Sequence, residues 1–278
     1  YSSYSKAEEN FPYYVQLRQK SGVYNKEFWC DEYFAYANDA WHHNDVGMQM
    51  TQYAAGFTSG MNNNVNRFLV WQMFDTLWDS GATHGEAHNP DTRPTSEFTG
   101  GVHMVGTCPS LVKADGETCT KENCPCKNYT KYSSYTPRIM YYGINLIGRF
   151  MNNENADVFA TEVIDDAAQD GIGVYVSAIK NDDGKTVIMV VNTMPTTSSV
   201  EINIERTDVI NFNRYTYDPN EIIPTVEAKP LPSDKTISLN GNTSFFDVIP
   251  AQSFAIYVEG GIFIGNDVEM EMPFDDMD

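Results

Sequence analysis

The hydrophobic pattern of the first half of the chain alternates between helical and strand-like periods. Apolar residues recur at helical spacing over residues 7–21, about 44–60 and about 137–151, which predicts three helices. Two short apolar runs at 26–32 and 67–73 predict strands that are covered on both faces. The order helix, strand, helix, strand, long loop and helix is typical of a parallel sheet with crossover helices.

Single residues mark the ends of the predicted helices. Gly22 supplies a stop after the first helix, because glycine readily adopts the left-handed conformation found at helix ends. Asn44 is placed to cap the start of the second helix, and Gly60 with the asparagines after it ends that helix. Pro137 stands near the first turn of the third helix, where its missing N–H is tolerated.

The pattern changes near residue 155. From there, segments that alternate with a period of two recur roughly every 8–12 residues, separated by turn residues such as Asn181–Gly184 and Asn240–Gly241. This spacing predicts an antiparallel β-sandwich. The predicted strands are 158–163, 173–179, 186–192, 199–204, 211–217, 236–239, 244–248 and 253–258.

Composition narrows the classes of function. Hydrophobic residues make up 41% of the 278 residues, so a sizeable core is available. The net charge of −20 argues against nucleic acid and anionic membrane surfaces as partners, because both would repel the chain. No apolar run reaches the length of about 18 residues that a membrane-spanning helix needs. The 17 tyrosines and 4 tryptophans suit stacking on sugars, and an aromatic sandwich core accounts for them equally well.

Four of the five cysteines fall within 19 positions of the long loop. Disulfides and a zinc site are both open for them, but the spacing lacks the paired C-x2-C of common zinc sites, so we predict disulfides. Together with sequons at Asn128 and Asn242, this cluster favours an extracytoplasmic protein. Cys30 is expected to be a small buried hydrophobe. The clustered cysteines are Cys108, Cys119, Cys124 and Cys126.

The five histidines do not suggest a metal site. His42 and His43 are neighbours, so their side chains point apart on any regular element. His84 and His88 have the spacing of a helical pair, but the glycine and proline around them favour a loop. We interpret the loop histidines, His103 among them, as residues that line a sugar cleft or lie in solvent. Neither a metal nor a cofactor is expected.

The strongest candidates for chemistry are Asp31 and Glu32, which end the predicted 26–32 strand. Burying adjacent carboxylates is costly unless they are paired or functional. Barrel enzymes keep their catalytic residues at the C-terminal ends of their strands, which is where these two carboxylates lie. The alternative interpretation is a solvated acidic turn, which is common in so acidic a chain.

In this order, the segments resemble the C-terminal part of the clan A glycoside hydrolases, in particular β-xylosidase-like and heparanase-like members. The resemblance is carried by Trp29–Tyr33, Leu69–Gln72, Arg138–Leu146, Lys185–Asn192 and Val248–Ile256. It implies an α/β partial (β/α)8 barrel, made of the last strands and helices, followed by an all-β antiparallel sandwich. It also implies retaining hydrolysis of O-glycosidic bonds in a poly- or oligosaccharide.

The same resemblance implies how the chain is divided. Residues 1–155 would be the C-terminal portion of a catalytic barrel, 156–260 the sandwich and 261–278 an acidic tail. The acid/base glutamate of the family is expected upstream of residue 1, so we expect an incomplete and inactive enzyme. The rival interpretation is a non-catalytic carbohydrate-binding or cell-surface module. A carbohydrate partner is expected in both cases, while the sugar, the linkage and the oligomeric state stay open.

The resemblance also assigns roles to residues. Glu32 matches the nucleophile that ends the seventh strand of the family, with Asp31 as its rival, because strand alternation lets only one of the two face the barrel mouth. Trp71 would stack under the sugar, or be ordinary barrel core. Tyr4 would donate a hydrogen bond to the nucleophile, or be an ordinary packing residue. The remaining substrate-binding candidates are Gln72, Asp75 and His103. Gln72 and Asp75 could instead merely cap the end of the strand.

Overall fold

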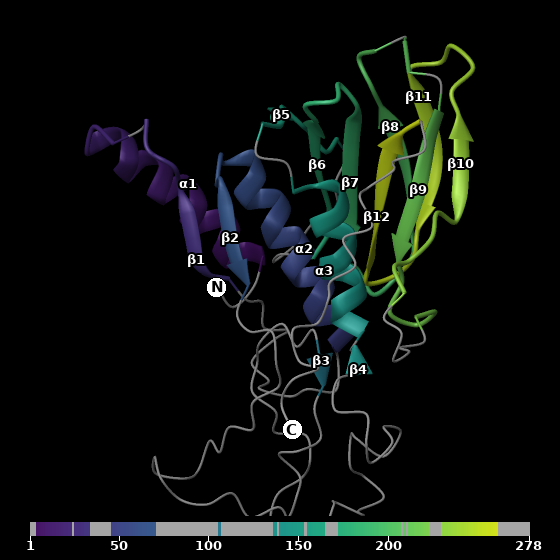
Figure 1. Cartoon of the computed structure of the whole chain (residues 1–278), viewed down its shortest axis with the longest axis horizontal. Helices are drawn as coiled ribbons and strands as arrows, with labels where there is room; N and C mark the ends of the chain where they lie inside the picture. Colours follow the sequence, from purple (N-terminus) through teal and green to yellow (C-terminus); the bar gives the residue numbers. More distant parts are fainter. Residues whose placement is uncertain are drawn as a thin grey trace, which may run out of the picture.

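A computed structural model places two helices between a small parallel sheet and a β-sandwich (Figure 1). None of the helices in the described ranges is long and apolar enough to cross a membrane. The structure describes residues 4–23, 25–33, 46–70, 105–106, 136–137, 139–152, 155–164, 172–206, 208–209, 211–222 and 229–260.

The first half of the chain forms helices and short strands close to the predicted bounds. The two apolar runs pair in parallel, with Trp29 opposite Arg67 and Cys30 opposite Phe68. This confirms that the two runs are adjacent, parallel strands. The elements are α1 Tyr4–Lys20, β1 Trp29–Tyr33, α2 Val46–Asn62, β2 Arg67–Val70, β3 Val105–Gly106, β4 Thr136–Pro137 and α3 Ile139–Phe150.

The prediction for Pro137 was wrong. This residue belongs to β4 and pairs with Val105 of β3, and α3 begins only at Ile139. Proline disfavours the helical conformation in the residue before it and is tolerated at the edge of a sheet, which suits a two-residue strand. The predicted buried face of the helix is nevertheless largely as expected, since Met140, Leu146 and Phe150 are buried.

The second half forms the predicted antiparallel sandwich. Its larger sheet has six strands in the order β10-β9-β12-β7-β6-β5, and its smaller sheet pairs β11 with β8. All of these pairings are antiparallel. The strands are β5 Asp157–Phe159, β6 Val174–Lys180, β7 Thr186–Asn192, β8 Ser198–Asn203, β9 Asn211–Tyr217, β10 Lys235–Ser238, β11 Ser244–Ile249 and β12 Ser253–Glu259.

The six-stranded sheet has a hydrophobic core on each of its faces. Along β7, Val187, Met189 and Val191 belong to the core shared with the helices. Ile188 and Val190 belong to the core shared with the smaller sheet. Successive side chains of a strand point to opposite faces, so this alternation buries all seven residues of β7.

Helices α2 and α3 cover the helical face of this sheet and pack closely on each other. A Cβ at Gly143 of α3 would lie 2.6 Å from Cγ of Met50 in α2, so a larger residue there would force the Met50 side chain to move. Two hydrogen bonds fix α2 on the sandwich: Thr51 Oγ1 donates to the carbonyl of Gln252 at 2.7 Å, and Asn62 Nδ2 to that of Val176 at 3.0 Å. One core cluster therefore joins the helices to the sandwich, while the domain division at residue 155 stays a prediction.

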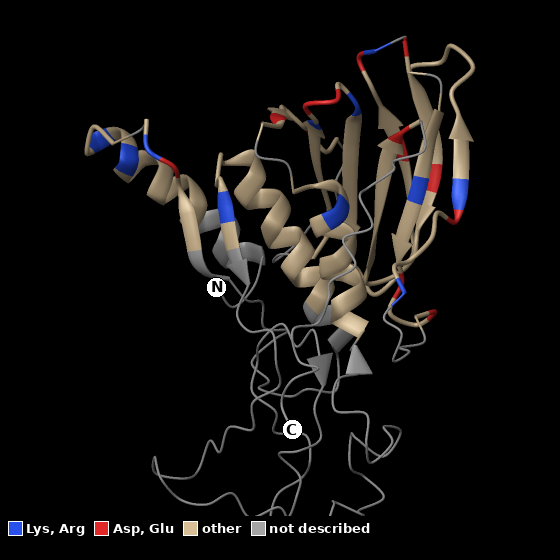
Figure 2. Ribbon diagram, in the orientation of Figure 1, with Lys and Arg blue, Asp and Glu red and all other residues tan. Residues whose placement is uncertain are grey.

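A buried ionic network links the two sheets of the sandwich. Asp247 of β11 is only 5% exposed and accepts hydrogen bonds from Arg214, Lys235 and Tyr257. These three donors sit opposite one another on β9, β10 and β12, and Figure 2 shows the opposite charges side by side there. Burial alone would raise the pKa of Asp247, but the hydrogen bonds from Lys235 and the other donors hold it below its usual value.

Candidate functional site

The predicted catalytic edge is the side of the molecule where β1 and β2 end. Because the two strands are parallel, their C-terminal ends meet at one edge, and the two arrows point the same way in Figure 1. Asp31 and Glu32 are the third and fourth residues of β1, just before its last residue, Tyr33. Val70 ends β2 and is followed in the sequence by Trp71. The carboxylate pair thus lies in β1, and the neighbouring strand β2 leads into the tryptophan.

A β-bulge interrupts the pairing at the carboxylates. Cys30 pairs with Phe68 and Tyr33 pairs with Val70, so three steps along β1 match two steps along β2. Asp31 and Glu32 therefore share the one position opposite Leu69. Bulges are frequent beside active sites, where they re-aim side chains and break strict alternation. Strand alternation therefore does not decide which of the two carboxylates faces the predicted barrel mouth.

The two faces of β1 have different environments. On one face Phe28 meets Phe11 of α1 edge to face, with ring centres 6.3 Å apart, and Cys30 is buried in the same core. On the other face Trp29 is 50% exposed. The prediction that this run is covered on both faces was therefore wrong for Trp29. In the described part of the chain, the parallel pair is covered by helices on one face only.

Polar partners hold the exposed indole of Trp29 in place. Its Nε1–H donates to a carboxylate oxygen of Glu27 at 2.6 Å, and the guanidinium of Arg67 lies over the ring, 5.1 Å from its centre. Arg67 Nε is also 3.5 Å from the Glu27 carboxylate. These three residues form an ordered polar and aromatic surface on the face of β1–β2 that the helices do not cover.

The structure places only some of the predicted site residues. Glu32 lies in β1, and Tyr4 is the first residue of α1, which begins on the side where β1 and β2 end (Figure 1). Trp71, Gln72, Asp75 and His103 lie outside the described residues. So do the other four histidines and the four clustered cysteines, whose disulfides stay a prediction. Cys30 is buried, as predicted. Within the described ranges, no group of three or more potential metal ligands comes together.

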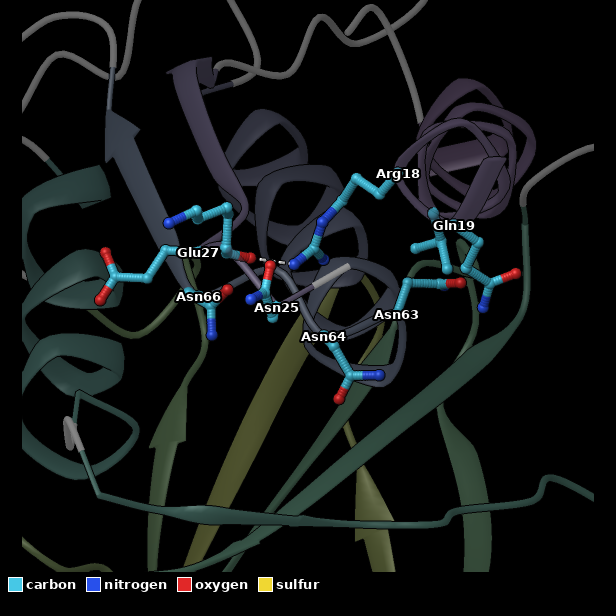
Figure 3. Close-up of a pocket in the computed structure, with 9 residues that line it drawn as sticks. Arg18, Gln19, Asn25, Glu27, Asn63, Asn64 and Asn66 are labelled. Carbon is cyan, nitrogen blue, oxygen red and sulfur yellow. Dashed lines mark hydrogen bonds between the residues drawn. The ribbon is translucent and has the colours of Figure 1, made fainter. Parts of the chain in front are cut away.

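A second candidate is a polar pocket at the opposite edge, where β1 and β2 begin. Its volume is about 390 Å³. Figure 3 shows side chains from the end of α1 and from the two loops that enter the strands surrounding it. The pocket is lined by Val15, Arg18, Gln19, Asn25, Lys26, Glu27, Asn63, Asn64 and Asn66.

The sequence reasoning missed this pocket, although its asparagines had been noticed as a helix stop. Both helices that reach the pocket end in the same capping motif. The N–H of Val23 bonds the carbonyl of Arg18 in α1, and the N–H of Val65 bonds that of Gly60 in α2. The residue before each of these valines is in the left-handed conformation, glycine in α1 and Asn64 in α2. The repeated motif is the signal that could have placed both loops at one edge.

Comparison with known proteins yields structures only. No protein-family model matches the sequence, and no curated protein matches it. Among solved structures, a GH30 endoxylanase from Clostridium papyrosolvens C71 has a TM-score of 0.50 and 17% identity, over 88% of this chain and 45% of that one.

Two further solved structures are arabinofuranosidases. An arabinose-bound GH51 α-L-arabinofuranosidase has a TM-score of 0.53 and 14% identity, over 93% of this chain and 35% of that one. The GH51 arabinofuranosidase from Xanthomonas axonopodis pv. citri has a TM-score of 0.52 and 12% identity, over 92% and 46%. This chain thus spans less than half the length of each of the three. At such low identity the likeness is one of fold, and the chain resembles in fold the C-terminal part of a clan A glycoside hydrolase.

Proposed function

We propose that this chain is the C-terminal part of a retaining glycoside hydrolase, with Glu32 as the nucleophile. The observation that carries the proposal is the carboxylate pair at the bulge of β1, beside the strand that leads into Trp71. It occurs in a chain whose fold resembles that of GH30 and GH51 enzymes. The similar structures are named as an endoxylanase and arabinofuranosidases, so xylans and arabinofuranosides are the first substrates to test.

Retaining hydrolysis needs two carboxyl groups about 5–5.5 Å apart. In the proposed reaction the carboxylate of Glu32 attacks the anomeric carbon and forms a glycosyl ester, while an acid protonates the leaving oxygen. Water then hydrolyses the ester, with the same acid acting as the base. We propose that this acid/base lies on a barrel strand that precedes residue 1, and that Trp71 stacks under the sugar. Tyr4, Gln72, Asp75 and His103 are proposed to hydrogen-bond the sugar or Glu32.

The uncovered face of the parallel pair supports the barrel part of the proposal. Parallel sheets occur almost only where both faces are covered, and two strands are too few to close a barrel. Residues 1–155 are therefore proposed as the end of a (β/α)8 barrel, 156–260 as its sandwich and 261–278 as an acidic tail. An extracytoplasmic location is part of the same proposal and rests on the composition of the chain.

The test compares two isosteric variants in the protein that carries the whole barrel. Glu32→Gln should lower turnover at least about 1,000-fold, because an amide cannot form and release a glycosyl ester. Asp31→Asn is the matched control and should keep much of the activity. A 2-fluoro-xyloside or 2-fluoro-arabinofuranoside that traps the ester should label Glu32, as read by peptide mass spectrometry. Labelling of Asp31 would reverse the assignment, and strong hydrolysis by the 278-residue chain alone would remove the need for an upstream acid.

One observation favours the alternative of a non-catalytic carbohydrate-binding module. Two facing sheets and the core between them lie within this chain. Under that alternative the sandwich binds glycan and the β1–β2 unit is a scaffold. Two results together would favour the module. The 278-residue chain would bind sugar, and every variant of Glu32 and Asp31 would keep full activity in the longer protein.

A further inference from the structure

The pocket at the start of β1 and β2 has the dimensions of a ligand site. Its volume of about 390 Å³ falls within the range of about 300–1,000 Å³ that is typical of small-molecule pockets. It lies at the opposite end of β1 from Glu32. Glu27 and Glu32 are five residues apart, which in an extended strand is about 17 Å. The pocket is thus separate from the proposed catalytic edge.

Hydrogen bonds join the segments that wall the pocket. Asn66 links the two loops, because its N–H donates to the carbonyl of Phe28 at 2.8 Å while its side-chain Oδ1 accepts from the N–H of Phe28 at 2.6 Å. The guanidinium of Arg18 donates to the carbonyl of Lys26 and lies over the Phe28 ring. A pocket that is formed in advance loses little entropy when it binds a ligand.

Amide side chains dominate the lining of the pocket. Five of its nine lining residues are asparagine or glutamine, and Figure 3 shows their side chains around the cavity. Within the described ranges, no hydrogen bond engages the side-chain amides of Gln19, Asn25 and Asn64. Each amide offers both a donor and an acceptor, and so does every sugar hydroxyl. This lining suits a ligand covered with hydroxyl groups.

Charges of both signs line the pocket, which suits a ligand without a net charge. They are Arg18, whose guanidinium donates to the carbonyl of Lys26, Lys26 itself, and Glu27, whose carboxylate accepts from Trp29. The chain as a whole carries a net charge of −20, which repels anions at long range. Arginine, lysine and glutamate can all form charge-assisted hydrogen bonds to hydroxyls, which strengthen the binding of a neutral sugar.

We propose that this pocket binds a segment of a neutral oligosaccharide. It would hold the polysaccharide chain at a second point, while the strand ends about 17 Å away act on another segment. Two linked contacts raise the effective concentration of substrate at the catalytic edge. This inference rests on the proposed glycoside hydrolase function for its biological sense, although the binding itself needs no catalysis.

The experiment is calorimetric titration of the 278-residue chain with xylohexaose, arabinohexaose, cellohexaose and laminarihexaose. At least one of them should bind, and Gln19→Ala combined with Asn25→Ala should weaken that binding at least tenfold. Gln16→Ala, an exposed glutamine of the same helix that does not line the pocket, is the matched control and should leave binding unchanged. Asn64 is left intact, because its φ of 57° is strained for most residues.

Hydrogen exchange locates the bound sugar. Peptides that cover 15–27 and 60–66 should gain protection, while Glu32→Gln should bind as well as the unmodified chain. Suppose instead that binding is lost in Glu32→Gln and kept in the double variant. The sugar would then lie at the strand ends, which would overturn the proposal for the pocket and support the proposed function. The absence of binding to all four sugars at millimolar concentration would also overturn the pocket, whatever the activity of the longer protein.

Discussion

The β1–β2 unit and the sandwich differ in how completely each is covered. Every residue of β7 is buried, because helices lie over one face of its sheet and the smaller sheet, made of β8 and β11, lies over the other. The parallel pair has helices on one face, while on the other Trp29 is half exposed. Within the described residues, the central strands of the sandwich are therefore covered on both faces, whereas the parallel pair is covered on one.

This difference separates two settings in which acidic residues occur. In the sandwich the buried carboxylate of Asp247 accepts hydrogen bonds from Arg214, Lys235 and Tyr257, so its charge is paired. In β1 the carboxylates of the sequence fall at a bulge, where pairing is irregular. Regular pairing with satisfied charges indicates stability, whereas acidic residues at an irregular strand end are more typical of a functional site.

The largest expected difference between the two regions is in hydrogen exchange. Amides of β7 and β12 should exchange on the order of 1,000-fold more slowly than those of β1 and β2, after correction for intrinsic rates, since well-covered central strands open only with global unfolding. Mass spectrometry of peptic peptides measures this directly. Equal protection of the four strands would show that the chain is one cooperative unit and would end the comparison.

The next effect tests the ionic network of the sandwich. Asp247→Asn should lower the free energy of unfolding by about 3 kcal/mol, because the largely buried Arg214 loses one of its two carboxylate partners and keeps only the more exposed Asp234. Urea denaturation followed by circular dichroism gives the value. Asp208→Asn is the control: its carboxylate also pairs with an arginine, Arg206, but is 71% exposed, so little change is expected. Equal losses in the two variants would mean that burial is not what matters.

The same variant predicts a change in pH dependence. The pKa of Asp247 is lower in the folded state than its usual value. Its contribution to stability is therefore complete above the pKa of the unfolded state, about 3.9, and is lost as the pH falls through the pKa of the folded state. The difference between the unmodified chain and Asp247→Asn should therefore be constant between about pH 5 and 7. It should shrink below about pH 4. A difference that grows with acid would contradict the lowered pKa.

A smaller effect is expected where α2 meets β2. A side chain at Gly60 would overlap the ring of Phe68, so Gly60→Ala should destabilise the chain by about 1–3 kcal/mol. Gly148→Ala is the matched control in α3, because nothing lies within 4 Å of the added carbon and alanine is the better helix former. It should stabilise by about 0.5–1 kcal/mol. Thermal unfolding of both variants decides, and a neutral Gly60→Ala would mean that β2 is loosely attached.

Strand positions in the sandwich could be predicted because the pattern that defines them is local. The strands at 186–192 and 211–217 have the predicted bounds, since alternation and flanking turns determine both ends. The strand predicted at 158–163 ends already at Phe159, because β5 pairs with β6 over three residues only. Hydrophobic alternation shows that a segment can be a strand, and its partner decides how long the strand is.

Features that depend on register could not be predicted in the same way. The network around Asp247 joins residues of four strands, which no local pattern relates. The bulge at Asp31 and Glu32 is likewise a property of pairing with β2. For the candidate site, the apolar run predicted that Asp31 and Glu32 lie at the end of a strand, and both are in β1. The sequence reasoning missed the pocket at the other edge, whose walls come from three separate segments.

The complete burial of β7 has a consequence for the synthesis of the chain. Thr186–Val191 combines β-branched and large apolar residues without any charge or proline, which is the composition of segments that aggregate when exposed. Asp183 and Lys185, paired at 2.9 Å, precede the strand, and Pro195 follows it. Such flanking residues act as gatekeepers against self-association. The solubility of the nascent chain should therefore depend on how soon β6 and β12 pair with this strand, more than on the acidic surface of the finished protein.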